Sequence, residues 1–153
     1  MVKKFEIKLA TIDDMKSVFD LSNDDLVRAN SFNQEKINWE NHKQWFNEKL
    51  NNKNCIFYMI KDYKNNLISQ VRLDKNADEG DISISISSEF RGKGYGVKIL
   101  KYASEKFLSE AKIKKINAYV KPTNKASKAI FEKAGYILIK DESEKMRYEY
   151  YAK

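Results

Sequence analysis

The N-terminal third of the chain combines one alternating segment with two segments of helical period. Alternation of charged and apolar residues from Lys3 to Ala10 predicts a strand. Residues 13–22 predict a helix that opens on Asp13 and Asp14, since carboxylates suit the free N–H groups of a helix start. A polar stretch without a clear period follows, and we expect it to be irregular. A second helix is predicted over residues 40–50, with one face formed by Trp39, His42, Phe46 and Leu50.

Three strands are predicted in the middle of the chain. Segments 54–61 and 67–74 are joined by a turn at Asn65-Asn66, because Asn tolerates the positive φ of hairpin turns. In segment 81–87 strict alternation puts Asp81 and three serines on one face and three isoleucines on the other. That polar face fits either the border of a hydrated acceptor cleft or the solvent side of an antiparallel sheet.

The last third predicts a crossover followed by two closing strands. A helix over 97–111 leads to a strand over 115–121, and Pro122 then interrupts the chain before a further helix that Thr123 or Asn124 can cap. Gly135 ends that helix, and strands near 136–140 and 145–151 close the fold. The fold class is α/β (α+β), a mixed and mostly antiparallel sheet of about seven strands flanked by four helices.

Composition narrows the class of protein. With 153 residues and 42% hydrophobic content, we expect one domain over residues 1–153. The lone Cys55 and the single histidine predict neither a disulfide nor a metal site, which fits a reducing cytoplasm. No segment has the length of a signal peptide or membrane span, so we expect a soluble cytoplasmic protein without a membrane partner.

The net charge of +7 favours anionic partners. Lysines are nevertheless scattered among 22 acidic residues, and no basic face with interleaved aromatics is visible. We therefore expect no nucleic-acid partner. A small acidic ligand would use the same positive charge, and lysines that simply solvate the surface are the alternative explanation.

Three of the five glycines lie in the hexapeptide 91–96, between the strand 81–87 and the helix 97–111. Glycines at every second position let backbone N–H groups converge, and the helix adds its positive N-terminal end, so the segment predicts a phosphate cradle. Arg91 and Lys93 add charge at its rim. The spacing matches neither the dinucleotide G-x-G-x-x-G nor the G-x-x-x-x-G-K-[ST] loop. A tight strand-to-helix connection is the alternative reading.

The hexapeptide resembles the [QR]-x-x-G-x-[GA] motif that binds the pyrophosphate of acetyl-coenzyme A in the GNAT acetyltransferases. A second segment is similar to that family's N-x-x-[AS]-x-x-x-[YF]-x-K-x-G-[FY] motif, and the order of predicted elements is similar to the GNAT fold over the whole chain. The residues that carry the second motif are Asn124, Ser127, Ile130, Phe131, Lys133, Gly135 and Tyr136. The resemblance implies an N-acetyltransferase with acetyl-CoA as cosubstrate and no metal.

The resemblance also implies that strands 81–87 and 115–121 splay apart and that pantetheine lies between them. The implied coenzyme contacts are Ile84, Ser85, Ile86, Arg91, Gly92, Lys93, Gly94, Tyr95, Gly96, Val97, Asn124, Ser127 and Phe131.

Direct acetyl transfer needs a neutral amine, donors for the transient oxyanion and a route for the amine proton. The backbone near Ile86 is the candidate oxyanion donor, and Asp81 is the candidate base or else an ordinary strand-edge carboxylate. The family often has a tyrosine acid where this chain has Phe131, so Tyr119, Tyr136 or water would protonate the leaving thiolate.

Acceptor choice is expected to lie in residues 22–50, which hold both tryptophans. The candidate substrate-binding residues are Arg28, Phe32, His42 and Trp45. An aromatic ring can stack on a base and Arg can bind a phosphate. For His42, on the apolar helix face, a hydrogen-bonded packing role is favoured over that of a base or substrate ligand.

The same segment resembles the subfamily that acetylates UDP-linked 4-amino sugars in pseudaminic acid and related glycan pathways. The resemblance rests on Ser22-Asn23-Asp24-Asp25-x-Val27-Arg28, Asn30-Ser31-Phe32 and His42-x-x-Trp45-Phe46. It implies a nucleotide-linked amino sugar as acceptor and leaves a homodimer open. The alternatives are acetylation of a protein or peptide amine and a coenzyme-binding sensor domain without turnover.

Overall fold

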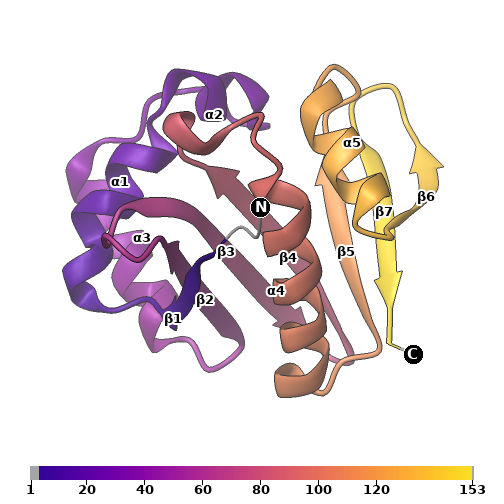
Figure 1. Cartoon of the computed structure of the whole chain (residues 1–153), viewed down its shortest axis with the longest axis horizontal. Helices are drawn as coiled ribbons and strands as arrows, with labels where there is room; N and C mark the ends of the chain where they lie inside the picture. The colour runs from indigo at the N-terminus through magenta and orange to yellow at the C-terminus, as the bar shows by residue number, and fades with distance from the viewer. Residues whose placement is uncertain (1–3, 153) are drawn as a thin grey trace. The chain divides into compact units, whose positions relative to one another are not determined.

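A computed structural model describes residues 4–152. Its α-helices and strands are named here in chain order. The helices are α1 (Met15–Ser22), α2 (Asp25–Asn30), α3 (Trp39–Asn51), α4 (Tyr95–Ala111) and α5 (Lys125–Lys133). The strands are β1 (Glu6–Leu9), β2 (Cys55–Lys61), β3 (Leu67–Asn76), β4 (Glu79–Ile86), β5 (Lys115–Val120), β6 (Ile137–Asp141) and β7 (Met146–Tyr151) (Figure 1).

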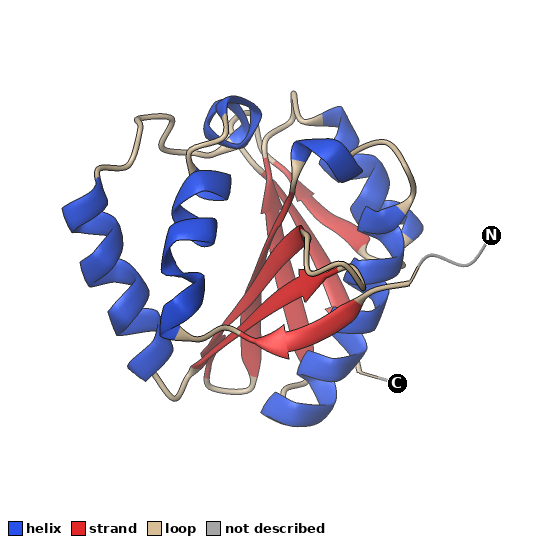
Figure 2. Cartoon of the chain, turned by 60° about the vertical axis from the view of Figure 1, so that its left-hand side comes forward, coloured by secondary structure: helices blue, strands red, loops and turns tan. Residues whose placement is uncertain are grey.

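The chain forms two compact units. The first runs to Arg72 and includes Ile84–Arg91, and the second comprises Leu73–Ser83 and the chain from Gly92 onward. Helices α1, α2 and α3 belong to the first unit, and α4 and α5 belong to the second. Figure 2 distinguishes the helices from the strands by colour. Strands β3 and β4 contribute residues to both units, and hydrogen bonding follows the strand order β1-β2-β3-β4-β5-β7-β6.

The first unit has its own apolar core beside the β1–β2 pair. These strands are antiparallel, with Glu6 opposite Lys61. Residues of α1, α3 and β2 form the core, because their apolar faces exclude water when packed together. The fully buried members are Val18, Phe46, Phe57 and Met59.

The second unit is built on the predicted crossover. Strands β4 and β5 are parallel and joined through α4, whereas β7 pairs antiparallel with both β5 and β6. Ala118 lies opposite Tyr148, whose ring stacks on Phe131 of α5, so this face of β5 and β7 packs under the helices. Strand alternation therefore puts Asn117 and Tyr119 on the opposite face.

The β4–β5 ladder is short. It pairs Glu79 with Lys115, Gly80 with Ile116 and Asp81 with Asn117, and among the described residues it ends there. Strand β5 nevertheless continues to Val120, so its last three residues lie beyond the ladder. Backbone groups beyond the end of a ladder are free to bind an extended ligand.

The predicted fold class is confirmed, with corrections in detail. The stretch after α1 is not wholly irregular, because Asp24 accepts hydrogen bonds from the N–H groups of Leu26 and Val27 and so caps α2, which raises the number of α-helices from four to five. Asn65 has φ of 68°, as the turn prediction requires. The first strand begins at Glu6, and Lys3 lies outside the described residues. The expectation of one domain remains a prediction.

Candidate active site

The glycine loop before α4 has the backbone of a cradle. Gly92 has φ of 70° and Gly94 has φ of 85°, in the left-handed region that favours glycine. Gly94 is also the N-cap of α4, and no side chain caps that helix. A Cβ on Gly96 would lie 2.8 Å from Cδ1 of Ile130, so this glycine lets α4 and α5 approach closely. The loop thus combines tight turning with the N-terminus of a 17-residue helix, which attracts anions.

The charged rim of the loop is divided between two roles. Lys93 is exposed, whereas the guanidinium of Arg91 is already engaged within the first unit. Nη2 of Arg91 donates to Oδ1 of Asp24 at 2.7 Å, and Nε donates to the carbonyl of Ile86 at 3.0 Å. Burial alone would raise the pKa of Asp24, but hydrogen bonds from Arg91 and from backbone N–H groups lower it below its ordinary value. The predicted contact of Arg91 with pyrophosphate remains a prediction.

Two predicted coenzyme residues form the cap of α5. Oδ1 of Asn124 accepts from the N–H of Ser127 at 3.2 Å, and Nδ2 donates to the Ser127 hydroxyl at 3.0 Å. Phe131 is buried further along the same helix, with its ring packed edge-on against Tyr136 at 5.0 Å between centroids. Asn124 and Ser127 thus cap α5 and Phe131 packs in the interior, and a contact with the coenzyme would be an additional role for each.

The β4 residues expected to hold pantetheine lie at the end of that strand, in the first unit. The three residues, Ile84, Ser85 and Ile86, are each half-buried. The Ser69 hydroxyl donates to the carbonyl of Ser85 at 2.8 Å, and Arg91 holds the carbonyl of Ile86. These bonds fix the backbone at which we expect the oxyanion donor.

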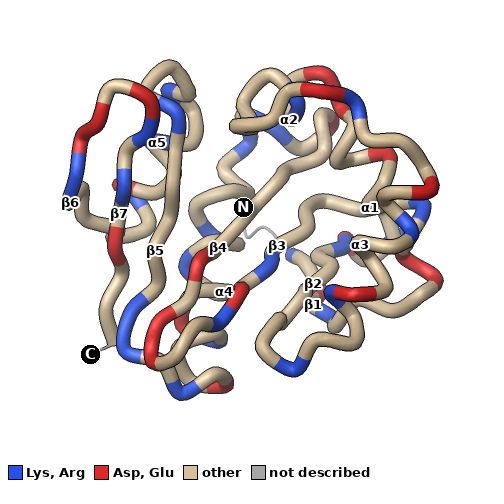
Figure 3. Tube along the Cα trace, turned by 180° about the vertical axis from the view of Figure 1, so that it is seen from behind, with Lys and Arg blue, Asp and Glu red and all other residues tan. Residues whose placement is uncertain are grey.

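Polar side chains gather on the face of the second unit opposite α4 and α5. Nδ2 of Asn117 donates to Oε1 of Glu79 at 3.0 Å and to Oδ1 of Asp81 at 3.2 Å. Tyr119 follows Asn117 on the same face of β5 and is 39% exposed. Figure 3 shows acidic and basic positions along β4, β5 and β7 in this unit. The structure thus brings the predicted base Asp81 and the predicted acid Tyr119 into one cluster.

Tyr119 and Tyr136 differ sharply as candidate acids. Burial and the nearby charge of Asp81 raise the pKa of Tyr119, so its hydroxyl keeps its proton over the neutral range. Tyr136 is buried, and its hydroxyl is hydrogen-bonded to the Ser104 hydroxyl at 2.7 Å. Burial also raises the pKa of Tyr136 strongly. Between the two tyrosines, the exposed Tyr119 is better suited to meet a leaving group.

Charged side chains on β5 and β7 neutralise one another beside this cluster. Glu149 is buried and forms ion pairs with Lys115 and Arg147, each at 3.1 Å. Burial would raise the pKa of Glu149, but its hydrogen bonds from Tyr151 and Lys115 and these two cations lower it. Lys115 also lies 3.7 Å from Glu79.

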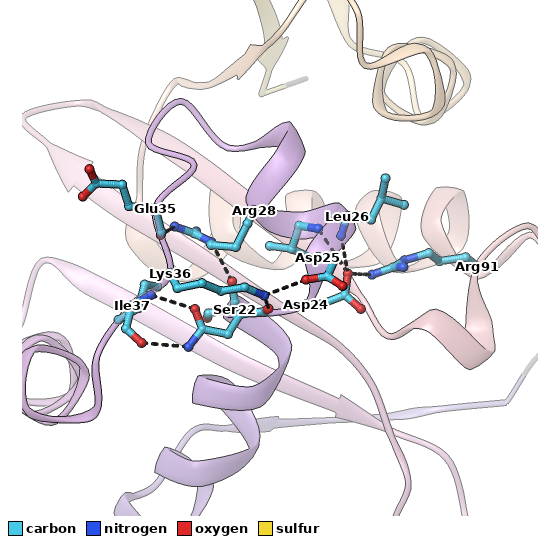
Figure 4. A network of polar contacts seen from close by, with 11 residues as sticks. Ser22, Asp24, Asp25, Leu26, Arg28, Glu35, Lys36, Ile37 and Arg91 are labelled. Carbon is cyan, nitrogen blue, oxygen red and sulfur yellow. Dashed lines mark hydrogen bonds and ion pairs between the residues drawn. The ribbon is translucent and has the colours of Figure 1, made fainter.

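The expected acceptor segment is held in shape by Arg28, whose guanidinium lies at the centre of a polar network in the first unit (Figure 4). Nε donates to the carbonyl of Ser22 at 2.8 Å, and Nη1 donates to the carbonyls of Asn33 and Glu35 at 3.0 and 3.1 Å. Nη2 donates to the Ser31 hydroxyl at 3.1 Å. A guanidinium has five N–H donors, so one donor is left for an acceptor phosphate.

A second set of contacts in Figure 4 closes the same segment. Asn23 bonds both the carbonyl and the N–H of Ile37 at 2.8 Å, and Lys36 donates to the Asn23 carbonyl and to Asp25. With Arg28, these bonds give residues 22–37 a defined shape although less than half of the segment is helical.

The three ring side chains predicted to contact the acceptor differ in their exposure to solvent. Phe32 is 55% exposed and available to a ligand. His42 is 1% exposed, and its Nε2 lies 2.8 Å from the carbonyl of Met15. A carbonyl only accepts a hydrogen bond, so Nε2 carries the proton. Burial lowers the pKa of His42, although the hydrogen bond to Met15 and the charge of Asp20 act to raise it. Trp45 packs beside the core under Arg72, with 5.0 Å from its ring centroid to Cζ. The structure therefore favours the packing interpretation of His42.

Asn117 is the residue that the sequence interpretation missed. The signal was present, because the alternation of Lys115, Asn117 and Tyr119 puts all three on one face, and a parallel β4–β5 pair puts Asn117 beside Asp81. Only the register of that pair, which is a tertiary property, shows the contact.

The described residues form a seven-stranded mixed sheet with a glycine loop at the start of a crossover helix, an arrangement that suits the pyrophosphate of a coenzyme. The family profile of the Acetyltransferase (GNAT) domain matches residues 4–137, and the chain belongs to this family. Its members transfer acetyl from acetyl-CoA to amines. A search among curated proteins found no match.

Two solved structures show the same fold at low sequence identity. A spermidine N-acetyltransferase from Vibrio cholerae, solved with CoA and spermine, has a TM-score of 0.86 at 17% identity, covering 96% of this chain and 95% of that one. A domain from Methanocaldococcus jannaschii has a TM-score of 0.84 at 24% identity, covering 97% and 99% of the two chains.

Two searches of the described residues bear on cofactors and membranes. Within residues 4–152, no group of three or more His, Cys, Asp or Glu side chains could hold a metal ion. No helix in the same range is long and apolar enough to cross a membrane.

Proposed function

We propose that this chain transfers acetyl from acetyl-CoA to the amino group of a nucleotide-linked 4-amino sugar. The observation that carries the proposal is the loop at Gly92 and Gly94, with left-handed φ at both glycines directly before the uncapped N-terminus of α4. Oriented backbone N–H groups at such a turn suit the pyrophosphate of a coenzyme.

The loop fits the pyrophosphate of coenzyme A through its backbone and through one side chain. The backbone of Gly92–Gly96 would hold the pyrophosphate, and Lys93 would add a cation at its edge. The end of β5 beyond the β4 ladder offers backbone groups to the pantetheine. Acetyl-CoA supplies the activated acetyl thioester.

Proton movement is assigned to the polar cluster on β4 and β5. The amine nitrogen forms a bond to the acetyl carbon, the carbon–sulfur bond breaks, and the products are an amide and the coenzyme thiol. Asp81 takes a proton from the amine, directly or through water. Tyr119, whose raised pKa keeps its hydroxyl protonated, gives a proton to the leaving sulfur. It takes the role of the tyrosine acid that the family often has where this chain has Phe131.

The acceptor assignment rests on the shape of residues 22–37. The network around Arg28 builds a fixed polar segment that leaves Phe32 exposed, and an exposed ring can stack on a nucleotide base. The remaining donor of Arg28 suits a phosphate oxygen. Homodimer formation remains a prediction.

A polyamine is the second candidate acceptor, and one observation favours it. Asp81 is an exposed carboxylate without an ion pair among the described residues, which suits a cationic substrate. The related Vibrio cholerae fold belongs to a spermidine N-acetyltransferase.

The two acceptors are separated by comparing kcat/KM for a UDP-linked 4-amino sugar, the same sugar without its nucleotide, and spermidine. The proposal predicts the highest value for the UDP-linked sugar. Equal values for the free and UDP-linked sugars would remove the nucleotide from the proposal, and preference for spermidine would replace it with the second candidate.

A further inference from the structure

Asn117 joins two carboxylates on the polar face of the second unit. It is 1% exposed, and its Nδ2 donates to Glu79 and Asp81. Ionised carboxylates only accept hydrogen bonds, so the amide nitrogen must face them and the orientation of the amide is fixed. Both N–H groups are therefore committed to β4.

The other end of the same amide lacks a donor. Oδ1 of Asn117 is buried and has no hydrogen-bond partner among the described residues. A buried carbonyl oxygen without a donor carries the free-energy cost of its lost hydration, so such a group calls for an explanation. A ligand that brings N–H donors to this atom would remove the cost.

The two carboxylates that Asn117 joins are not equivalent. Glu79 has a resident cation, because Lys115 lies 3.7 Å from it and is itself held by Glu149. Asp81 is exposed and, among the described residues, lies in no ion pair. One carboxylate is thus neutralised within the protein, while the other is oriented by Asn117 and left for a cation from outside.

We propose that Asp81 and Asn117 form a binding site for the ammonium group of the acceptor. An alkylammonium has three N–H donors, and this pair offers the carboxylate oxygens of Asp81 and the unpartnered Oδ1 of Asn117. Glu79 also accepts from Nδ2, which fixes the orientation of the amide and leaves Oδ1 as its unpartnered end. The site deepens the proposed function, on which it rests, because it selects a primary ammonium whichever molecule carries it.

The site can be tested without turnover. Protein labelled with ¹⁵N and saturated with CoA is titrated with butylammonium chloride, and the side-chain amide signal of Asn117 is followed by NMR. We expect a saturable shift that the neutral isostere 1-butanol and an equal concentration of potassium chloride do not produce. A comparable saturable shift with 1-butanol would overturn the proposal.

Variants separate the site from general charge effects. Asp81→Asn is expected to weaken butylammonium binding at least about tenfold. Asp78→Asn, at an exposed carboxylate of the turn that precedes β4, should leave it unchanged. Asn117→Leu should weaken it similarly, and Asp81→Asn keeps the test decisive if that core variant does not fold. Equal affinity in wild type and Asp81→Asn would refute the site.

A separate assay keeps the two proposals apart. Butylammonium binding with no acetyl transfer to any amine would uphold the ammonium site and overturn the proposed function. Acetyl transfer without specific butylammonium binding would do the reverse.

Discussion

Replacement of Gly94 by alanine tests the coenzyme loop most quantitatively. Gly94 has φ of 85° and ψ of 2°, and a Cβ in this left-handed region costs about 1–2 kcal/mol. Gly94 is exposed, so the ligand-free loop can relax away from the strained conformation. Binding must then restore it, and the cost is expected in the CoA dissociation constant as an increase of about 5- to 30-fold.

Gly135→Ala is the matched control. Gly135 also has positive φ, at 100°, but it ends α5, where an added Cβ would lie 3.3 Å from the Tyr150 ring. Here the strain should lower the free energy of unfolding and leave CoA affinity unchanged. Calorimetric titration with CoA and urea unfolding measure both quantities for each variant. CoA affinity unchanged in Gly94→Ala, or reduced equally in Gly135→Ala, would refute the assignment of the loop.

Four further substitutions test other parts of the account. Arg28→Ala should lower the free energy of unfolding by about 2 kcal/mol, because four hydrogen bonds are lost, and urea unfolding measures it. Phe32→Ala should raise KM for a UDP-linked sugar about tenfold through lost stacking, while its stability stays near wild type since the ring is exposed. Tyr119→Phe should lower kcat about 100-fold without changing CoA affinity, and an unchanged kcat would exclude it as the acid. The pKa of Asp24 is lowered, so its pairing with Arg91 stabilises the fold above about pH 4 and this stabilisation is lost as the pH falls further. In Asp24→Asn the free energy of unfolding, measured against pH, should therefore fall less steeply in acid than in the wild type.

The sequence predicted the regular elements well because their patterns are local. Alternation predicted β4, helical periodicity predicted α4, and the cap at Asn124 with Gly135 after the last turn predicted α5. Helix α2 was missed because its six residues make fewer than two turns, which is too few to show a helical period in the sequence. Its start also depends on the cap at Asp24.

The candidate site was predicted less completely because side-chain partners come from distant parts of the chain. Arg28 was expected to bind a phosphate, but most of its donors hold carbonyls of residues 22–35. Arg91 was expected at the coenzyme rim, and it pairs with Asp24, 67 residues away. Asn117 gains its contacts only through the β4–β5 register. Composition and periodicity do not show which distant residue a side chain will contact in the folded chain.

Acetyl transfer can be followed with acetyl-CoA labelled with ¹³C at the acetyl carbonyl, incubated with the purified protein and a UDP-linked 4-amino sugar. We expect that the ¹³C signal moves from the thioester to an amide, that the sugar gains the mass of one acetyl group, and that free coenzyme A appears in equal amount. Persistence of the thioester signal with this sugar, with its free form and with spermidine, in samples where acetyl-CoA binding is demonstrated, would contradict this expectation.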